Sequence, residues 1–221
     1  LTAALDQTEL PPQGDLWDEP PRIGRFRATW IALAILFLTI IALILINRAE
    51  APQKANPLVT LKTTKGDITL ELFLDKTPIT ARNFLELAKQ GFYKGTKFHR
   101  VIPNFMIQGG DPNSKDSNKD IYGQGGPGYT IQDEFREGLS NLRGTISMAN
   151  TGEPNSGSSQ FFINVADNTG LDFDKEPFAS SHPVFGKVVN GMEVVDAIAG
   201  TETDERNIPV LPVIIEDVIL F

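Results

Sequence analysis

The chain has 221 residues, a formal net charge of −8 and no cysteine. This length accommodates one ordinary domain with an appendage, and the lack of cysteine excludes disulfides, thiolate chemistry and zinc sites that use cysteine. Most of the negative charge falls on residues 57–221, which carry 15 basic and 22 acidic side chains. A domain this acidic is a poor candidate for binding nucleic acid or an anionic lipid surface, so no nucleic-acid partner is expected.

The first 27 residues form a separate polar segment, rich in proline, aspartate and glutamate and without apolar periodicity. Such a composition buries too little apolar surface to offset the entropy lost on ordering. Residues 1–27 are therefore predicted to be a disordered polar tail.

An apolar stretch follows, in which Thr29 and Thr39 are the only polar side chains between Ala28 and Ile46. As a helix it would span roughly 28 Å, close to the ~30 Å hydrocarbon core of a bilayer. A buried core helix is rarely apolar on all sides at this length. We therefore predict a single transmembrane helix at residues 28–47, with a linker at 48–57.

A cleaved signal peptide is the alternative, because Ala49-Glu50-Ala51 has the small-x-small form of a cleavage site. Against this, the apolar stretch is longer than a signal core, and Pro52 would directly follow the cut. An uncleaved anchor is the better interpretation.

The basic residues that flank the stretch predict its orientation. Three arginines precede it and two basic residues follow it, namely Arg22, Arg25 and Arg27 against Arg48 and Lys54. The positive-inside rule then places the N-terminus in the cytoplasm and the following domain in an extracytoplasmic space, the periplasm or a lumen.

The rest of the chain is predicted to form short strands and two helices. Residues 59–63 and 68–72 alternate apolar and polar side chains across a turn and predict a hairpin. Helices are expected from Pro78 to the stop at Gly91 and over 191–199, and a last strand over 213–221. This pattern indicates an antiparallel β-protein, with a barrel and a sandwich equally compatible.

One arginine, Arg100, lies in an otherwise apolar run that also contains Phe105, Met106 and, at the other end of the same predicted strand, Gln108. Burying a guanidinium group costs several kcal/mol unless it is hydrogen-bonded. We therefore expect Arg100 to be a fixed donor at the wall of an apolar pocket, suited to a substrate with a polarisable but uncharged bond.

Residues 98–111, the glycine-rich turn at 123–128, and the runs 146–152 and 157–163 resemble, in this order, the signature segments of the cyclophilins, the peptidyl-prolyl cis/trans isomerases. The resemblance covers most of residues 58–221. It implies a mainly β domain, a closed eight-stranded antiparallel barrel capped by two helices.

The resemblance also implies an active site. Arg100 would be the catalytic donor and Gln108 would orient it. The residues implied to bind the substrate are Phe105, Met106, Ala149, Asn150, Thr151, Gln160, Phe162, Leu171 and His182. Four of these would form the cup for the proline ring (Phe105, Met106, Phe162 and Leu171), and Asn150 would offer main-chain groups to the peptide. No cofactor and no metal are implied, and the partners are proline-containing polypeptides.

Two positions depart from the family pattern. Gly170 stands where many cyclophilins have a tryptophan beside the pocket leucine, and Thr151 stands where the family commonly has alanine. The loop at 173–181 is also longer than is usual in the family. We therefore expect weaker binding of cyclosporin, while the chemistry of Arg100 is unaffected.

Other chemistries are weaker candidates. The two histidines have no plausible nucleophile as a partner, which argues against a hydrolase triad, and His99 is expected to be packed. Residues 111–116 begin like a calcium loop, but Lys115 takes a ligand position and Asp116 replaces the turn glycine. We expect a solvated loop there.

The sequence thus predicts a membrane-anchored prolyl isomerase that acts on X–Pro bonds of unfolded or exported proteins. The alternative is a cyclophilin-fold binding or scaffold subunit of a membrane protein complex, with incidental or no turnover.

Overall fold

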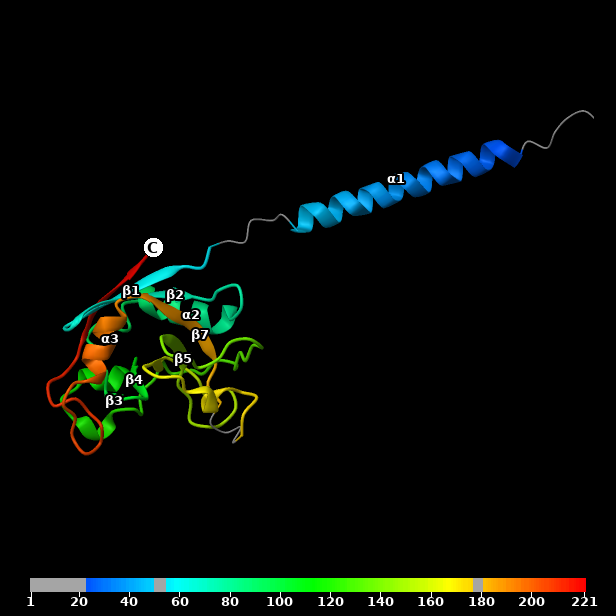
Figure 1. Cartoon of the computed structure of the whole chain (residues 1–221). Helices are drawn as coiled ribbons and strands as arrows, with labels where there is room; N and C mark the ends of the chain where they lie inside the picture. The colour runs from blue at the N-terminus through cyan, green and yellow to red at the C-terminus, as the bar shows by residue number, and fades with distance from the viewer. Residues whose placement is uncertain (1–22, 50–54, 177–180) are drawn as a thin grey trace, which may run out of the picture. The chain divides into compact units, whose positions relative to one another are not determined.

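A computed structural model of the chain describes residues 23–49, 55–176 and 181–221 (Figure 1). The chain divides into two compact units, residues 1–52 and 53–221. The described residues of the first unit form the helix α1 (Ile23–Ala49), which includes the last residues of the predicted tail. The remaining tail residues, 1–22, and residues 50–54 of the predicted linker lie outside the described residues.

The helix predicted at residues 28–47 is present as part of α1, but a membrane span is not found there. In the described portion of the chain, no helix combines the length and the apolar character that crossing a bilayer requires.

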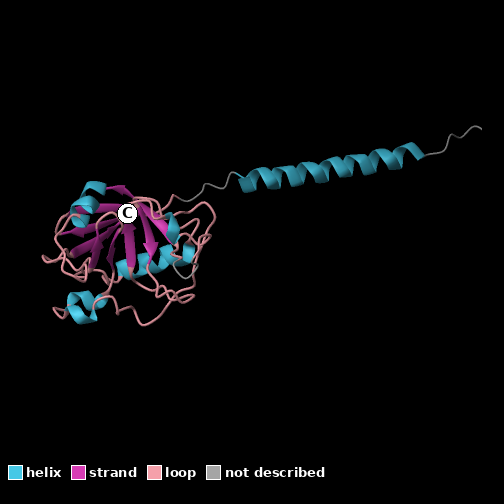
Figure 2. Cartoon of the chain, turned by 60° about the horizontal axis from the view of Figure 1, so that its bottom comes forward, coloured by secondary structure: helices cyan, strands magenta, loops and turns pink. Residues whose placement is uncertain are grey.

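In its described residues, 55–176 and 181–221, the second unit is an eight-stranded antiparallel sheet with two α-helices and three short 3₁₀ helices (Figure 2). Its strands are β1 (Leu58–Thr63), β2 (Gly66–Leu72), β3 (Arg100–Ile102), β4 (Met106–Gly109), β5 (Thr145–Met148), β6 (Phe161–Asn164), β7 (Val184–Asn190) and β8 (Ile215–Leu220). Its helices are α2 (Pro78–Lys89), α3 (Met192–Ala199), η1 (Pro112–Lys115), η2 (Lys119–Ile121) and η3 (Thr169–Leu171). The strand order is β3-β4-β6-β5-β7-β2-β1-β8.

The prediction of a closed barrel is wrong, because the outermost strands β3 and β8 do not pair and the curved sheet stays open. The irregular segment before β8 covers the free edge of β3 instead. The N–H of Val101 donates to the carbonyl of Asn207 at 2.8 Å. Pro209 and Pro212 lie in this segment, and a proline has no N–H to donate to a ladder. The segment therefore protects the edge without extending the sheet.

The predicted hairpin, the two predicted helices and the last strand of this unit are confirmed. The hairpin turns between β1 and β2, and α2 begins at Pro78. The second helix, α3, begins at Met192, after Gly191, which has a φ of 88°. A Cβ at Gly191 would lie 2.2 Å from the carbonyl oxygen of Asp67, so only glycine fits this turn.

Aromatic packing under α2 fixes β6, the strand that carries Phe162, one of the residues predicted for the site. The rings of Phe84, on α2, and Tyr93 stack at 4.8 Å, and Phe84 meets the edge of Phe161 at 5.4 Å. All three side chains are fully buried. Because neighbouring side chains on a strand point to opposite faces, anchoring Phe161 in the core directs Phe162 to the other face of β6.

Candidate active site

Arg100 and Gln108 lie directly opposite each other on the paired strands β3 and β4. The guanidinium group of Arg100 donates to Oε1 of Gln108 at 3.3 Å. Gln108 is therefore not at the far end of the strand that carries Arg100, as the sequence suggested, but across the ladder from it. The turn between the two strands, with Asn104 at a φ of 58°, makes this pairing possible.

A second glutamine continues this contact away from the arginine. Nε2 of Gln108 donates to Oε1 of Gln160 at 3.0 Å. Nε2 of Gln160 in turn donates to the carbonyls of Gly123 and Gly125, at 3.0 and 2.9 Å. We call Gln160 and Gln108 the amide relay, because together they connect the glycine-rich turn to Arg100.

Beside Arg100 lies a cavity of about 170 Å³, which we call the cup. The cup is walled mainly by apolar side chains from β4, β6 and the loops that flank them. Its lining residues are Arg100, Phe105, Met106, Gln108, Ala149, Asn150, Phe162, Leu171 and His182. Its position and lining suit a small apolar ring with a polar group turned toward Arg100.

The far wall of the cup is held by His182. Its ring meets the ring of Phe162 edge-on at 5.2 Å, and its Nδ1 lies 3.1 Å from the carbonyl oxygen of Met148. Burial lowers the pKa of His182, so the imidazole is neutral at pH 7. The same carbonyl sets the tautomer, because it requires a proton on Nδ1.

A larger hollow of about 650 Å³, which we call the groove, adjoins the cup and shares Gln108, Ala149 and Asn150 with it. Thr151 and Gln160 line the groove and not the cup. All eleven residues predicted for the site therefore lie along these two adjoining hollows.

The groove presents a free main-chain segment to a peptide. The side chain of Asn150 is occupied, because its Nδ2 donates to the carbonyl of Ser181 at 2.8 Å. The main-chain N–H and C=O of Asn150 make no hydrogen bond to another residue in the described part of the chain. Both groups are therefore available to pair with an extended substrate.

Arg100 is more accessible than the sequence suggested. The side chain is exposed rather than enclosed, with its guanidinium carbon 6.0 Å from the centre of the Phe105 ring. Partial burial lowers the pKa of Arg100, but arginine starts so high that the group stays cationic at neutral pH. A substrate can reach this donor directly from the solvent.

Sequence reasoning missed two buried polar groups behind the site. Asp111, expected in a solvated loop, is completely buried and accepts a hydrogen bond from the N–H of Gly123. Asn141 is also buried, and it donates to the carbonyls of Leu171 and His182, each at 3.2 Å. The sequence did offer a signal for Asp111, because it lies between a glycine pair and the glycine-rich turn.

His99 is packed, as expected, and neither of its ring nitrogens has a hydrogen-bond partner among the described residues. In the described part of the chain, no cluster of three or more His, Asp or Glu side chains could hold a metal ion.

Comparison with known proteins defines the class. Residues 58–219 match the family described as cyclophilin type peptidyl-prolyl cis-trans isomerase/CLD. The chain belongs to this family and is a peptidyl-prolyl cis-trans isomerase.

Individual relatives agree with this assignment. A peptidyl-prolyl cis-trans isomerase of Acinetobacter baylyi is 46% identical over 168 residues, which is 74% of this chain and 85% of the relative. Peptidyl-prolyl cis-trans isomerase B of Escherichia coli is 44% identical, over 73% of this chain and 98% of the relative. A crystal structure of a Cryptosporidium parvum cyclophilin in the presence of the dipeptide Ala-Pro superposes with a TM-score of 0.66. The two chains are 33% identical, and the match covers 74% of this chain and 98% of that one.

Proposed function

We propose that Arg100 catalyses rotation about X–Pro peptide bonds by donating a hydrogen bond to the prolyl nitrogen while the proline ring occupies the cup. The observation that carries this proposal is the place of Arg100, exposed at the rim of the cup and held by Gln108. The X–Pro bond resists rotation because its C–N bond has partial double-bond character. In the twisted state the nitrogen lone pair is released from conjugation and accepts the hydrogen bond.

This interaction exists only at the twist, so it stabilises the transition state more than the ground state. Uncatalysed isomerisation takes about 10–100 s. A turnover on the order of 100 s⁻¹ would therefore need roughly 4–5 kcal/mol, at ~1.4 kcal/mol per tenfold. A charge-assisted hydrogen bond supplies about 1.5–3 kcal/mol, and the apolar cup contributes further by removing water from the bond.

The substrates we propose are unfolded or newly exported polypeptides. The residues that line the groove include no charged side chain, so the groove imposes no charge requirement on the residues that precede the proline. The free main-chain groups of Asn150 suit any extended chain, and a broad substrate range fits a folding catalyst.

We also propose that α1 tethers the enzyme to a membrane, with the catalytic domain in the periplasm or a lumen. Support comes from the apolar stretch in the sequence, from its basic flanks, and from large exposed side chains such as Trp30 and Phe37, 71% and 65% exposed. An exposed apolar surface of this kind is typical of a site that contacts a membrane or another protein. Washing membranes with carbonate tests this proposal, since a tethered protein stays in the pellet and a peripheral one is released.

Protease added to intact cells or spheroplasts tests the orientation. An extracytoplasmic domain is released by cleavage at residues 48–56, whereas a cytoplasmic domain is released only after lysis. The second result would remove the proposed role in export. Reversal of the orientation when Arg22, Arg25 and Arg27 are all replaced by glutamate would support the positive-inside argument.

A protease-coupled assay with a short X–Pro peptide tests the catalytic proposal on the full chain in detergent. Arg100→Ala is expected to lower kcat/KM by about tenfold or more, because the transition state loses its donor. Arg82→Ala is the matched control, since Arg82 is an exposed arginine on α2 outside both hollows. Equal activity of wild type and Arg100→Ala would reject the mechanism, because turnover would then not depend on the Arg100 donor.

A further inference from the structure

Asp111 is a buried carboxylate that the mechanism above does not use. It follows Gly110 directly and is completely buried. No lysine or arginine in the described part of the chain forms an ion pair with it. An unpaired charge in such a place is costly unless hydrogen bonds compensate it.

Two main-chain N–H groups provide that compensation. Oδ1 of Asp111 accepts from the N–H of Asn113 at 2.9 Å, and Oδ2 accepts from the N–H of Gly123 at 2.5 Å. The carboxylate therefore joins the two ends of the loop that contains η1 and η2. It also fixes the position at which the glycine-rich turn begins.

The turn packs directly against this carboxylate. A Cβ added at Gly125 would lie 2.2 Å from Oδ1 of Asp111, and Gly123 has a φ of 81°. Both positions thus require glycine, the first for space and the second for its backbone conformation. The carbonyls of Gly123 and Gly125 are consequently held in place by Asp111.

These two carbonyls determine which way the amide relay is oriented. A carbonyl can only accept, so both require the NH₂ group of Gln160. The oxygen of Gln160 must then face Gln108 and receive its NH₂ group. Gln108 is left with its own oxygen directed at Arg100, which can only donate. Rotating either amide by 180° would place two acceptors or two donors in contact.

We propose that Asp111 is a positioning residue for the isomerase reaction, which sets the orientation of Arg100 through Gly123, Gly125 and the amide relay. This inference rests on the proposed role of Arg100. Without Asp111 the turn is free to shift, and Gln160 and Gln108 lose the contacts that define their orientation. The cup itself is unaffected, because its apolar walls come from other residues.

Asp111→Asn is the first test, because asparagine has nearly the same shape but only one acceptor oxygen. One of the two N–H groups then faces an NH₂ group. We expect kcat to fall about tenfold, equivalent to ~1.4 kcal/mol of transition-state stabilisation. We expect KM to change less than about threefold, because the cup still binds the proline.

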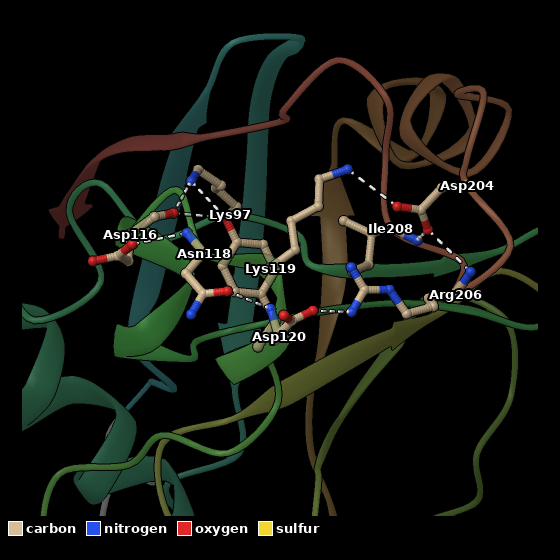
Figure 3. Close-up of polar contacts among 9 residues, drawn as sticks. Lys97, Asp116, Asn118, Lys119, Asp120, Asp204, Arg206 and Ile208 are labelled. Carbon is tan, nitrogen blue, oxygen red and sulfur yellow. Dashed lines mark hydrogen bonds and ion pairs between the residues drawn. The ribbon is translucent and has the colours of Figure 1, made fainter.

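Asp116→Asn is the matched control. Asp116 belongs to the same loop, and its Oδ1 accepts from the N–H of Asn118 at 2.8 Å (Figure 3). Within the part of the chain that the structure describes, no hydrogen bond joins the Asp116 carboxylate to Gln160, so this variant is expected to keep the wild-type kcat. Urea unfolding of both variants checks that each is folded at the assay temperature.

A double-mutant cycle separates positioning from a general loss of stability. In a Gln160→Ala background the relay is already interrupted, so Asp111→Asn is expected to lower kcat by less than about twofold. In ¹⁵N spectra, Asp111→Asn should shift the side-chain signals of Gln160 and of Arg100, and Asp116→Asn should leave them in place. If Asp111→Asn does not fold, Gly125→Ala replaces it, with the same expected shifts and loss of kcat.

The outcomes distinguish this inference from the proposed mechanism. A folded Asp111→Asn variant with wild-type kcat overturns the positioning role. The role is also overturned if Asp111→Asn lowers kcat as much in the Gln160→Ala background as in the wild type. If either result is found while Arg100→Ala is inactive, the proposed role of Arg100 stands and only the role of Asp111 is rejected. If Arg100→Ala is fully active, the mechanism itself fails.

Discussion

The cup is walled by side chains that project from the sheet and its loops, whereas the adjoining groove is walled largely by glycines and uncharged polar groups. The shape of the cup depends on apolar packing, which tolerates small changes in volume. The shape of the groove depends on hydrogen bonds, each of which requires a particular donor and acceptor. The cup is therefore suited to binding the proline, and the groove side is suited to orienting the group that acts on it.

The largest expected effect is on stability, and it separates two neighbouring phenylalanines of β6. Phe161 is enclosed by the rings of Phe84 and Tyr93, while Phe162 faces the cup. Phe161→Ala should lower the free energy of unfolding by about 3–5 kcal/mol because it leaves a core cavity. Phe162→Ala should cost less stability and mainly raise KM. Urea titration measures the stability of the two variants, and steady-state kinetics measures KM. If both variants were equally destabilised and Phe162→Ala left KM unchanged, the assignment of Phe161 to the core and Phe162 to the cup would be contradicted.

A smaller effect is expected at Gly170, directly before the cup residue Leu171, where the resemblance to the cyclophilins implied a tryptophan. Among the described residues, no atom would lie within 4 Å of a Cβ at Gly170, which leaves space for a side chain to start there. Gly170→Trp should tighten cyclosporin binding by about 1–3 kcal/mol, through one hydrogen bond and added ring contact. Calorimetric titration measures this change. Tight binding by the unmodified protein would refute the expectation.

Loss of the amide relay should act on kcat rather than on binding. Gln108→Leu keeps the volume of the side chain but removes its contacts with Arg100 and Gln160. We expect kcat to fall about tenfold with KM nearly unchanged. A rise in KM at constant kcat would show that Gln108 serves the cup and not the orientation of Arg100.

The smallest effect is a loss of stability in mild acid. Burial lowers the pKa values of His99 and His182 in the folded protein. The unfolded chain, with histidine pKa values near 6.5, then binds more protons than the folded chain below that pH. Stability should be constant above about pH 7, decline as the pH falls through 6.5, and level off below the folded pKa values. Urea midpoints measured from pH 8 to pH 5 give the slope, which His182→Gln should reduce; an unchanged slope would exclude His182 as a source.

Local patterns predicted much of the fold, because hairpins and short helices depend on neighbouring residues. The alternation around Gly66 and the proline at Pro78 were sufficient for β1, β2 and α2. Closure of the sheet was mispredicted because it depends on how the segment near Asn207 meets β3, about a hundred residues earlier. Sequence periodicity carries no information on such a contact.

The sequence predicted the site residues that line the cup and the groove, but not the buried residues that hold those residues in place. Arg100 and Phe162 were assigned from the resemblance, and the structure brings them to one cavity. Asp111 was assigned to a solvated loop because its burial results from an N–H donated by Gly123, twelve residues further along the chain. Motif spacing alone does not reveal such a partner.

The most direct test of the account separates binding from rotation at Arg100. Exchange NMR on an X–Pro peptide at saturating protein gives the rate of rotation of the bound peptide, and a titration gives its Kd. For Arg100→Ala the account predicts a rotation rate lower by about tenfold or more, with Kd within about threefold of wild type. A wild-type rotation rate in this variant, or a loss of binding at an unchanged rate, would contradict the central claim that Arg100 acts on the twisted bond.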